Sequence, residues 1–173
     1  THFGEQYGVS LKDGTIFLVN QRERPVSNGV KMDIYNLFWY SKEDAFFMNR
    51  WVPFRDVRGA SPFTPAFERN VLRPFAKTFE GHVEELKKAA EAIGGTSVKQ
   101  GDAGYIILAF DCIPMQYLFC DGDDEFSAQA NILYDYSVTD YIHVESTVSL
   151  ATEGILRLAE TAGLELKGNI FRM

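Results

Sequence analysis

The sequence predicts an α+β protein with a mostly antiparallel sheet, and three observations support this fold class. An Asp-Gly turn separates two β-rich runs near the start of the chain. Apolar residues then recur at helical spacing through the middle of the chain. Three β-rich segments follow one another before a final helical pattern. Because strands are grouped rather than alternating with helices, we expect an N-terminal hairpin and a C-terminal three-strand meander, packed with about four helices.

The composition is that of one acidic globular domain. The chain has 173 residues, of which 24 are acidic and 17 are Lys or Arg, so its formal charge is −7; 46% of residues are hydrophobic and 14% aromatic. This length supports a core of its own, and no linker or repeat divides residues 1–173. The apolar content excludes intrinsic disorder. An acidic balance argues against nucleic acid as a partner, because DNA binding needs a basic face.

The first elements follow from turn chemistry and spacing. Residues 7–19 predict a hairpin, because Asp13-Gly14 tolerates the positive φ of a tight turn between two β-rich runs. The polar residues 20–29 predict a loop or a short edge strand. Apolar side chains in residues 34–38 stand at helical spacing, which predicts a helix that begins near Asp33.

A short strand and a phenylalanine-rich helix are predicted next. Residues 51–54 indicate the strand. Thr64 before Pro65 is the residue pair expected at the start of a helix, with the threonine as N-cap. Pro74 lies inside this helix and should kink or split it. The helix places apolar residues at every fourth position: Phe67, Val71, Phe75 and Phe79.

Two further helices show amphipathic spacing. Residues 83–93 predict one that ends at Gly94-Gly95. Residues 144–162 predict the last, with Gly163 as its stop. Together with the two preceding segments, they give the expected four helices.

The meander lies between these two helices. Residues 105–110 are apolar on both faces and predict a central strand. Pro114 interrupts the chain before a second strand over 115–119, and residues 127–136 alternate as a third strand should.

An acidic turn between the last two strands is the most unusual local feature. Asp121, Asp123, Asp124 and Glu125 place four carboxylates within five residues, so their repulsion needs water, a cation or a basic partner to screen it. One interpretation is a site for Mg²⁺ or Ca²⁺ with these four residues as ligands. The others are a solvated turn and a docking surface for a basic partner. The EF-hand pattern is not met, because Phe126 replaces the required glycine.

The stretch from Phe119 to Asp135, which contains this turn, resembles domain of unknown function 3786. The similarity extends upstream through residues 51–55 and 67–79 and downstream into the last helix. The resemblance implies an uncharacterised family of anaerobic bacteria and archaea, some of whose members are attached to a cysteine-rich iron–sulphur segment. It therefore implies an iron–sulphur or other redox protein as a partner, while Cys112 and Cys120 supply no iron–sulphur ligand set in this chain. It carries over no catalytic residues.

Half of the 24 aromatic residues lie between Tyr35 and Phe79. Such a segment builds either an ordinary core or the wall of a ligand pocket. In the second case the candidate pocket residues are Trp51, Phe54, Arg55 and Asn131.

Catalytic motifs are absent from the sequence: there is no nucleophile elbow, phosphate-binding loop or dinucleotide fingerprint. His143, with Asp135 upstream of it, is the best candidate for acid–base chemistry. Two isolated cysteines are typical of a cytoplasmic protein, and no apolar stretch reaches the length of a membrane span. The chain begins at Thr1 rather than at methionine, which is consistent with a piece of a longer protein.

Three functional hypotheses follow. The first is a non-catalytic cytoplasmic module that binds a ligand or partner in anaerobic redox metabolism. The second is a small divalent-metal-dependent enzyme built on residues 121–125. The third is a homodimer joined through the sheet face that carries Gln129 and Asn131.

Overall fold

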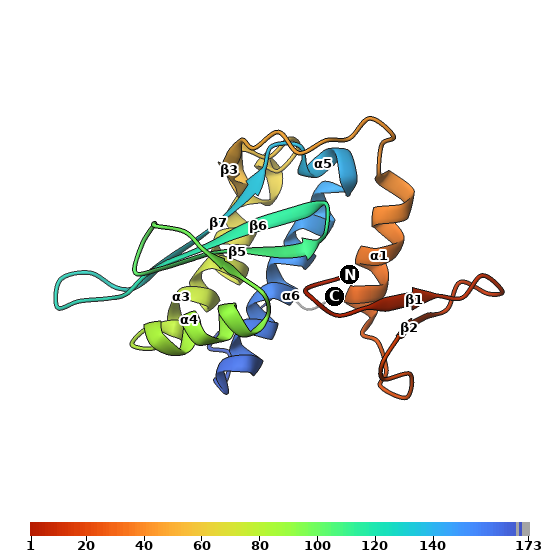
Figure 1. Cartoon of the computed structure of the whole chain (residues 1–173). Helices are drawn as coiled ribbons and strands as arrows, with labels where there is room; N and C mark the ends of the chain where they lie inside the picture. Colours follow the sequence, from red (N-terminus) through yellow and green to blue (C-terminus); the bar gives the residue numbers. More distant parts are fainter. Residues whose placement is uncertain (169, 171–173) are drawn as a thin grey trace.

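The fold is α+β, with one five-stranded antiparallel sheet and a separate two-stranded hairpin (Figure 1). It is described by a computed structural model that covers residues 1–168 and 170. The large sheet has the strand order β3-β7-β6-β5-β4. Its strands are β3 (Trp51–Pro53), β4 (Thr96–Ser97), β5 (Ala103–Phe110), β6 (Ile113–Cys120) and β7 (Gln129–Asp135). The hairpin consists of β1 (Tyr7–Val9) and β2 (Ile16–Leu18), as the Asp-Gly turn predicts.

Helices cover one face of the large sheet, and α1 stands beside α6 at the end of the molecule opposite the β6–β7 turn (Figure 1). The α-helices are α1 (Asn28–Tyr40), α2 (Thr64–Phe67), α3 (Arg73–Phe79), α4 (Val83–Ala92), α5 (Val138–Tyr141) and α6 (Val144–Ala162). Two 3₁₀ turns, η1 (Phe54–Asp56) and η2 (Ser61–Phe63), and a π-helical segment, η3 (Glu68–Leu72), complete the elements. Within the described part of the chain, no helix has the length and apolarity needed to cross a membrane.

The core lies between the sheet and the helices, and aromatic side chains dominate it. Phe54 stacks on Phe67 with ring centroids 4.0 Å apart, and Phe75 meets the rings of Tyr117 and Phe119 at 6.1 Å. All five are buried. The expected phenylalanine stripe is therefore core, as regular helical spacing predicts.

The helix that carries this stripe is split, as Pro74 predicts. The hydrogen-bond pattern changes from α in α2 to π in η3 and returns to α in α3, whose second residue is Pro74. The proline lacks an N–H, so the change of pattern next to it accommodates a bond that an α-helix would lose. The expected N-cap at Thr64 is wrong: Thr64 is already helical, and its hydroxyl donates to the carbonyl of Ala60 instead.

Three other details differ from the expectations. α1 begins five residues before Asp33, because the Ser27 side chain accepts from the Val30 N–H and caps the helix there. Pro114 lies within β6 rather than before it, opposite Leu108 and next to an irregularity in the β5–β6 register. The middle strand of the sheet is β6, whereas β5 lies beside the two-residue edge strand β4.

The outer face of α1 and the adjoining pocket

The inner face of α1 packs on α6 through apolar and polar contacts. Val30 and Ile34 are buried there. The Asn36 amide donates to Ser146 Oγ at 2.8 Å, and Ser149 Oγ donates to Asp33 Oδ2 at 2.9 Å. These contacts fix which side of α1 faces the protein.

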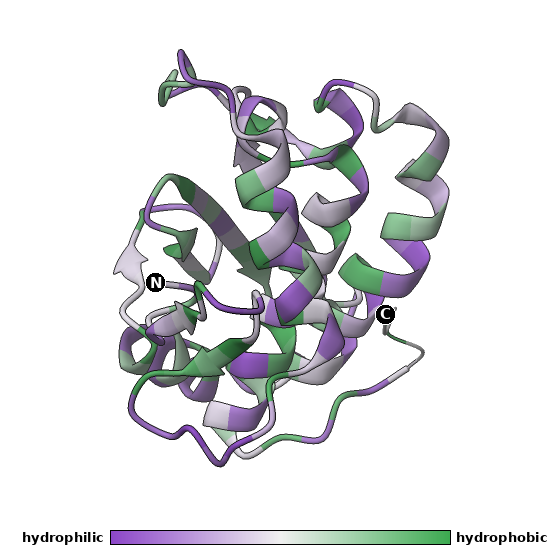
Figure 2. Cartoon of the chain, turned by 90° about the vertical axis from the view of Figure 1, so that its right-hand side faces the viewer, coloured by the Kyte–Doolittle hydropathy of each residue, from purple (hydrophilic) through white to green (hydrophobic). Residues whose placement is uncertain are grey.

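The outer face of α1 is apolar as well. Met32, Tyr35 and Trp39 follow one another at helical spacing on the side opposite the buried residues, and Phe38 flanks them. Trp39 is 84% exposed and Phe38 70%. The only ionisable side chains of α1 besides its two tyrosines are Lys31 and the buried Asp33. Figure 2 views the molecule from the side on which α1 lies.

The size of this surface is at the upper end of what a single domain exposes. A fully exposed aromatic or methionine side chain presents roughly 200 Å². On that basis the four residues above, together with Tyr40, expose on the order of 600 Å². The largest apolar patch on a monomeric protein is about 300–600 Å², and a helix that is apolar all round is normally covered on all sides. We call these five residues the outer face of α1.

A pocket of about 220 Å³ opens between α1, the hairpin and the β5–β6 turn. Its walls are mostly apolar, and Phe38 belongs both to the pocket and to the outer face of α1. The residues that line it are Thr1, His2, Tyr7, Val9, Ile34, Leu37, Phe38, Phe110, Asp111 and Cys112. The pocket and the exposed helix face are therefore continuous.

His2 is the buried polar residue of the pocket wall. Its Nδ1 lies 2.8 Å from the Ala109 carbonyl, so this nitrogen carries the proton, and its ring packs on Phe3 and Phe110. Burial and the nearby Arg157 charge lower its pKa to about 3, which keeps the imidazole neutral. Among the described residues, Nε2 has no hydrogen-bond partner. It is a buried acceptor whose lone pair is unused.

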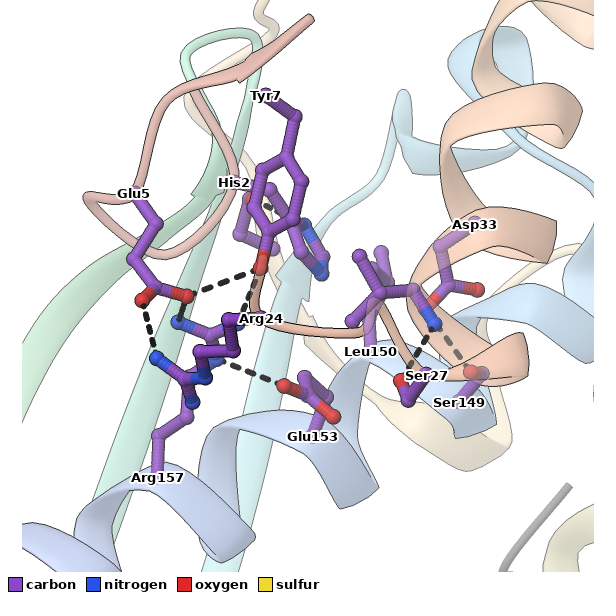
Figure 3. A network of polar contacts seen from close by, with 12 residues as sticks. His2, Glu5, Tyr7, Arg24, Ser27, Asp33, Ser149, Leu150, Glu153 and Arg157 are labelled. Atoms are coloured by element: carbon purple, nitrogen blue, oxygen red, sulfur yellow. Dashed lines mark hydrogen bonds and ion pairs between the residues drawn. The ribbon is translucent and has the colours of Figure 1, made fainter. Parts of the chain in front are cut away.

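A polar network holds the hairpin side of the pocket against α6 (Figure 3). Arg157 on α6 contacts the Glu5 carboxylate at 2.6 Å and the Glu153 carboxylate at 2.7 Å, and it donates to the Tyr7 hydroxyl at 3.1 Å. Arg24 adds a second ion pair to Glu5 at 3.1 Å. Burial alone would raise the pKa of Glu5, but the bonds from Arg157 and Tyr7 lower it. The donors of Arg157 are thus used to position the hairpin.

The candidate acid–base pair has structural contacts. His143 is the N-cap of α6: its Nδ1 accepts from the Glu145 N–H at 3.3 Å, and its ring lies 5.1 Å from that of Tyr40. Asp135 at the end of β7 accepts from the N–H groups of Met48, at 3.0 Å, and Arg50, at 2.9 Å. Among the residues described, no hydrogen bond joins His143 to Asp135. A catalytic role for either residue stays a prediction.

The Asp135 carboxylate accepts several hydrogen bonds, two of them from the segment that precedes β3. Ser137 donates to it from both its backbone N–H and its hydroxyl. Burial favours the neutral acid, but the hydrogen bonds from Ser137, Met48 and Arg50 outweigh it and lower the pKa of Asp135. The carboxylate therefore remains charged and holds three backbone positions.

The four candidate pocket residues have different surroundings. Phe54 is in the core against Phe67, and Arg55 is exposed in η1. Trp51 is half-buried on β3, next to the ring of Phe47. Asn131 is half-buried on β7, opposite Leu118. The aromatic segment is divided between the core and an exposed surface.

The acidic turn lies far from α1, at the tip of the β6–β7 connection (Figure 1). Asp121 Oδ1 accepts from the N–H groups of Gly81 and Gly122, each at 2.9 Å. Asp123 Oδ1 accepts from the N–H groups of Glu125 and Phe126, which lowers the pKa of Asp123. Asp124 and Glu125 are exposed. In the described residues, no three His, Cys, Asp or Glu side chains are grouped closely enough to hold a metal ion.

We expect divalent cations to leave thermal stability unchanged. An ion that binds only the folded chain stabilises it by about 2.7 kcal/mol at a hundred times its dissociation constant. Because one oxygen of Asp121 and one of Asp123 already accept backbone hydrogen bonds, and no three ligands are grouped among the described residues, thermal melts with millimolar Mg²⁺, Ca²⁺ or Mn²⁺ should match those with EDTA. A rise in melting temperature that is lost in Asp124→Asn would restore the metal hypothesis.

The fold and this surface define a small α+β domain with a solvent-facing apolar helix. The model of the family described as "Domain of unknown function (DUF3786)" matches residues 1–157, so the chain belongs to that family. No curated protein and no solved structure matches it.

Sequence reasoning missed the outer face of α1, although a signal was present. Residues 30–40 include apolar or aromatic side chains on every side of the helix. This pattern is typical of a helix that is covered on all sides. His2 and Arg157 could not be found in this way, because their contacts join residues more than 100 positions apart.

Proposed function

We propose that the chain is a non-catalytic binding module whose outer α1 face docks a protein partner. The observation that carries this proposal is that α1 exposes Trp39 and Phe38 while its other side is already packed on α6. Tryptophan and tyrosine are the residues most enriched at energetic centres of protein interfaces. About 600 Å² on each partner lies near the lower limit for a specific contact. The expected complex is therefore a transient one.

The family supplies the context for the partner. We propose that it is an iron–sulphur or other redox protein in the cytoplasm of an anaerobe, as the resemblance of residues 119–135 implies. The outer face of α1 carries no acidic side chain, and Lys31 lies one turn before Tyr35 on the same side of the helix. A chain with a charge of −7 can therefore approach an acidic partner there without local repulsion.

The two alternative functions receive less support. The metal-dependent enzyme requires ligands at the acidic turn, where Oδ1 of Asp121 and Oδ1 of Asp123 already accept hydrogen bonds. The homodimer through Gln129 and Asn131 would use a sheet face on which Gln129 is exposed and Asn131 half-buried. That face presents less exposed aromatic surface than α1.

The docking proposal is tested by introducing a charge into the apolar face. A tagged wild-type chain, isolated from its host under anoxic conditions, should enrich one partner. Trp39→Lys should lose it, because a lysine in the centre of the contact would be buried without a counter-charge. Leu11→Lys is the matched control, since Leu11 is fully exposed on the hairpin turn.

Both variants should melt at the wild-type temperature, because exposed substitutions change stability by less than about 0.5 kcal/mol. If Trp39→Lys retains the partner as well as Leu11→Lys does, the outer face of α1 is not the docking surface.

A further inference from the structure

The pocket beside the outer face of α1 has room for one aromatic ring. Its volume is about 220 Å³, and apolar side chains such as Val9, Leu37 and Phe110 form much of its wall. A cavity of about 150 Å³ with apolar walls accommodates benzene, whereas sites for larger ligands span about 300–1,000 Å³. The pocket is therefore too small for a dinucleotide or a cluster and large enough for a single side chain.

Among the described residues of the wall, the one buried side-chain nitrogen or oxygen without a hydrogen-bond partner is an acceptor, Nε2 of His2. The buried His2 donates from Nδ1–H to the Ala109 carbonyl, and within residues 1–168 and 170 its Nε2 has no hydrogen-bond partner. Leaving such a group unpaired destabilises the folded chain. A ligand that donates a hydrogen bond to Nε2 recovers part of this cost, whereas one that only accepts does not.

Anionic ligands do not suit the pocket. The Arg157 guanidinium is the cation whose charge acts most strongly on His2, and it is already paired with Glu5 and Glu153. At the rim, the Asp111 carboxylate is paired with the N-terminal ammonium at 3.3 Å and accepts from the Thr1 hydroxyl at 2.6 Å, so the rim offers no unpaired cation. A neutral aromatic group with a donor therefore fits the walls best.

We infer that the pocket receives the anchor residue of the docking partner, a tyrosine or tryptophan whose O–H or N–H donates to Nε2 of His2. This inference rests on the proposed function, because Phe38 joins the pocket to the outer face of α1. Nε2 is covered in the unbound chain, so entry of the anchor requires part of the wall to move. Phe38 is the wall residue of α1 with the most freedom to move, since 70% of it is exposed.

Fragments that mimic the anchor test the inference without the partner. The probes are p-cresol, which has the tyrosine hydroxyl, and 4-methylanisole, which has the same ring but no donor. In NMR titrations of the ¹⁵N-histidine-labelled chain, p-cresol should bind about three- to tenfold more tightly than 4-methylanisole, as one hydrogen bond predicts. It should also shift the Nε2 resonance of His2.

Two variants complete the test. His2→Phe keeps a ring against Phe110 and should bind the two fragments equally, whereas Val9→Trp should fill the pocket and bind neither. Equal affinity of the wild-type chain for both fragments, or no binding of either at millimolar concentration, would overturn the inference. Neither result bears on the Trp39→Lys experiment, so failure of the anchor and failure of the docking face are distinguished.

Discussion

Replacing Asp33 by asparagine is expected to stabilise the protein, and increasingly so as the pH rises. Asp33 is completely buried between α1 and α6, where Ser149 is its one donor and Oδ1 has no partner among the described residues. Burial raises its pKa from 3.8 to about 8, with the Glu153 charge adding to the effect. Asparagine has nearly the same shape and no charge to desolvate.

The direction of the pH dependence follows from proton binding. Between pH 4 and 8 the folded chain holds a proton on Asp33 that the unfolded chain has lost, so stability falls as the pH rises. The slope approaches 1.4 kcal/mol per pH unit over about four pH units, so the difference between Asp33→Asn and wild type should reach about 5 kcal/mol near pH 8. His2 contributes in the opposite direction below pH 6.5, where the unfolded chain gains a proton first, and does so equally in both proteins.

Urea unfolding of both proteins at pH 4, 6 and 8 measures this difference. Ser149→Ala provides a control, because it removes the remaining donor and should raise the pKa of Asp33 further. Parallel stability curves for wild type and Asp33→Asn would show that the carboxyl is not neutral in the folded chain.

The second large effect is expected at Asp135, which the sequence suggested as a catalytic residue. Asp135→Ala removes the acceptor for three backbone N–H groups and the Ser137 hydroxyl. Charged hydrogen bonds contribute about 1.5–3 kcal/mol each, but water replaces part of them at the exposed Met48 and Arg50. We expect a loss of about 3 kcal/mol in the free energy of unfolding.

Hydrogen exchange separates this structural role from a catalytic one. The amides of Met48, Arg50 and Ser137 should exchange much faster in Asp135→Ala, while those of β6 change only with global stability. Asp140→Ala is a matched control, because Asp140 is also acidic and bonded but pairs with Lys42 and Arg58 at the surface. Unchanged exchange at positions 48 and 50 would contradict the role assigned to Asp135.

Local sequence signals predicted the helices and strands that end at residues with a clear terminating role, such as a glycine at the end of a helix. The last helix runs from Val144 to Ala162 as expected, because Gly163 adopts the left-handed conformation that ends it at φ 68°. The start of α1 was misplaced because Ser27 caps it from within a polar segment that reads as loop. α5 was not expected, since four residues are too few for a periodic pattern.

The candidate site was harder to predict than the fold. The residues from Tyr35 to Phe79 divide into core rings such as Phe75 and exposed rings such as Trp39, and spacing alone does not show which side of a helix is covered. The acidic turn drew attention through its composition, although Asp121 and Asp123 hold backbone N–H groups. The contacts of His2 and Arg157 depend on tertiary structure.

Site-specific photocrosslinking in intact cells tests the docking role of α1 most directly. A benzophenone side chain placed at position 39 or 35 lies on the outer face of α1, and one placed at position 11 or 126 is exposed elsewhere on the protein. The docking account predicts one protein crosslinked at positions 39 and 35 and absent at 11 and 126. No crosslinked protein at 39 and 35, or the same product at all four positions, would contradict it.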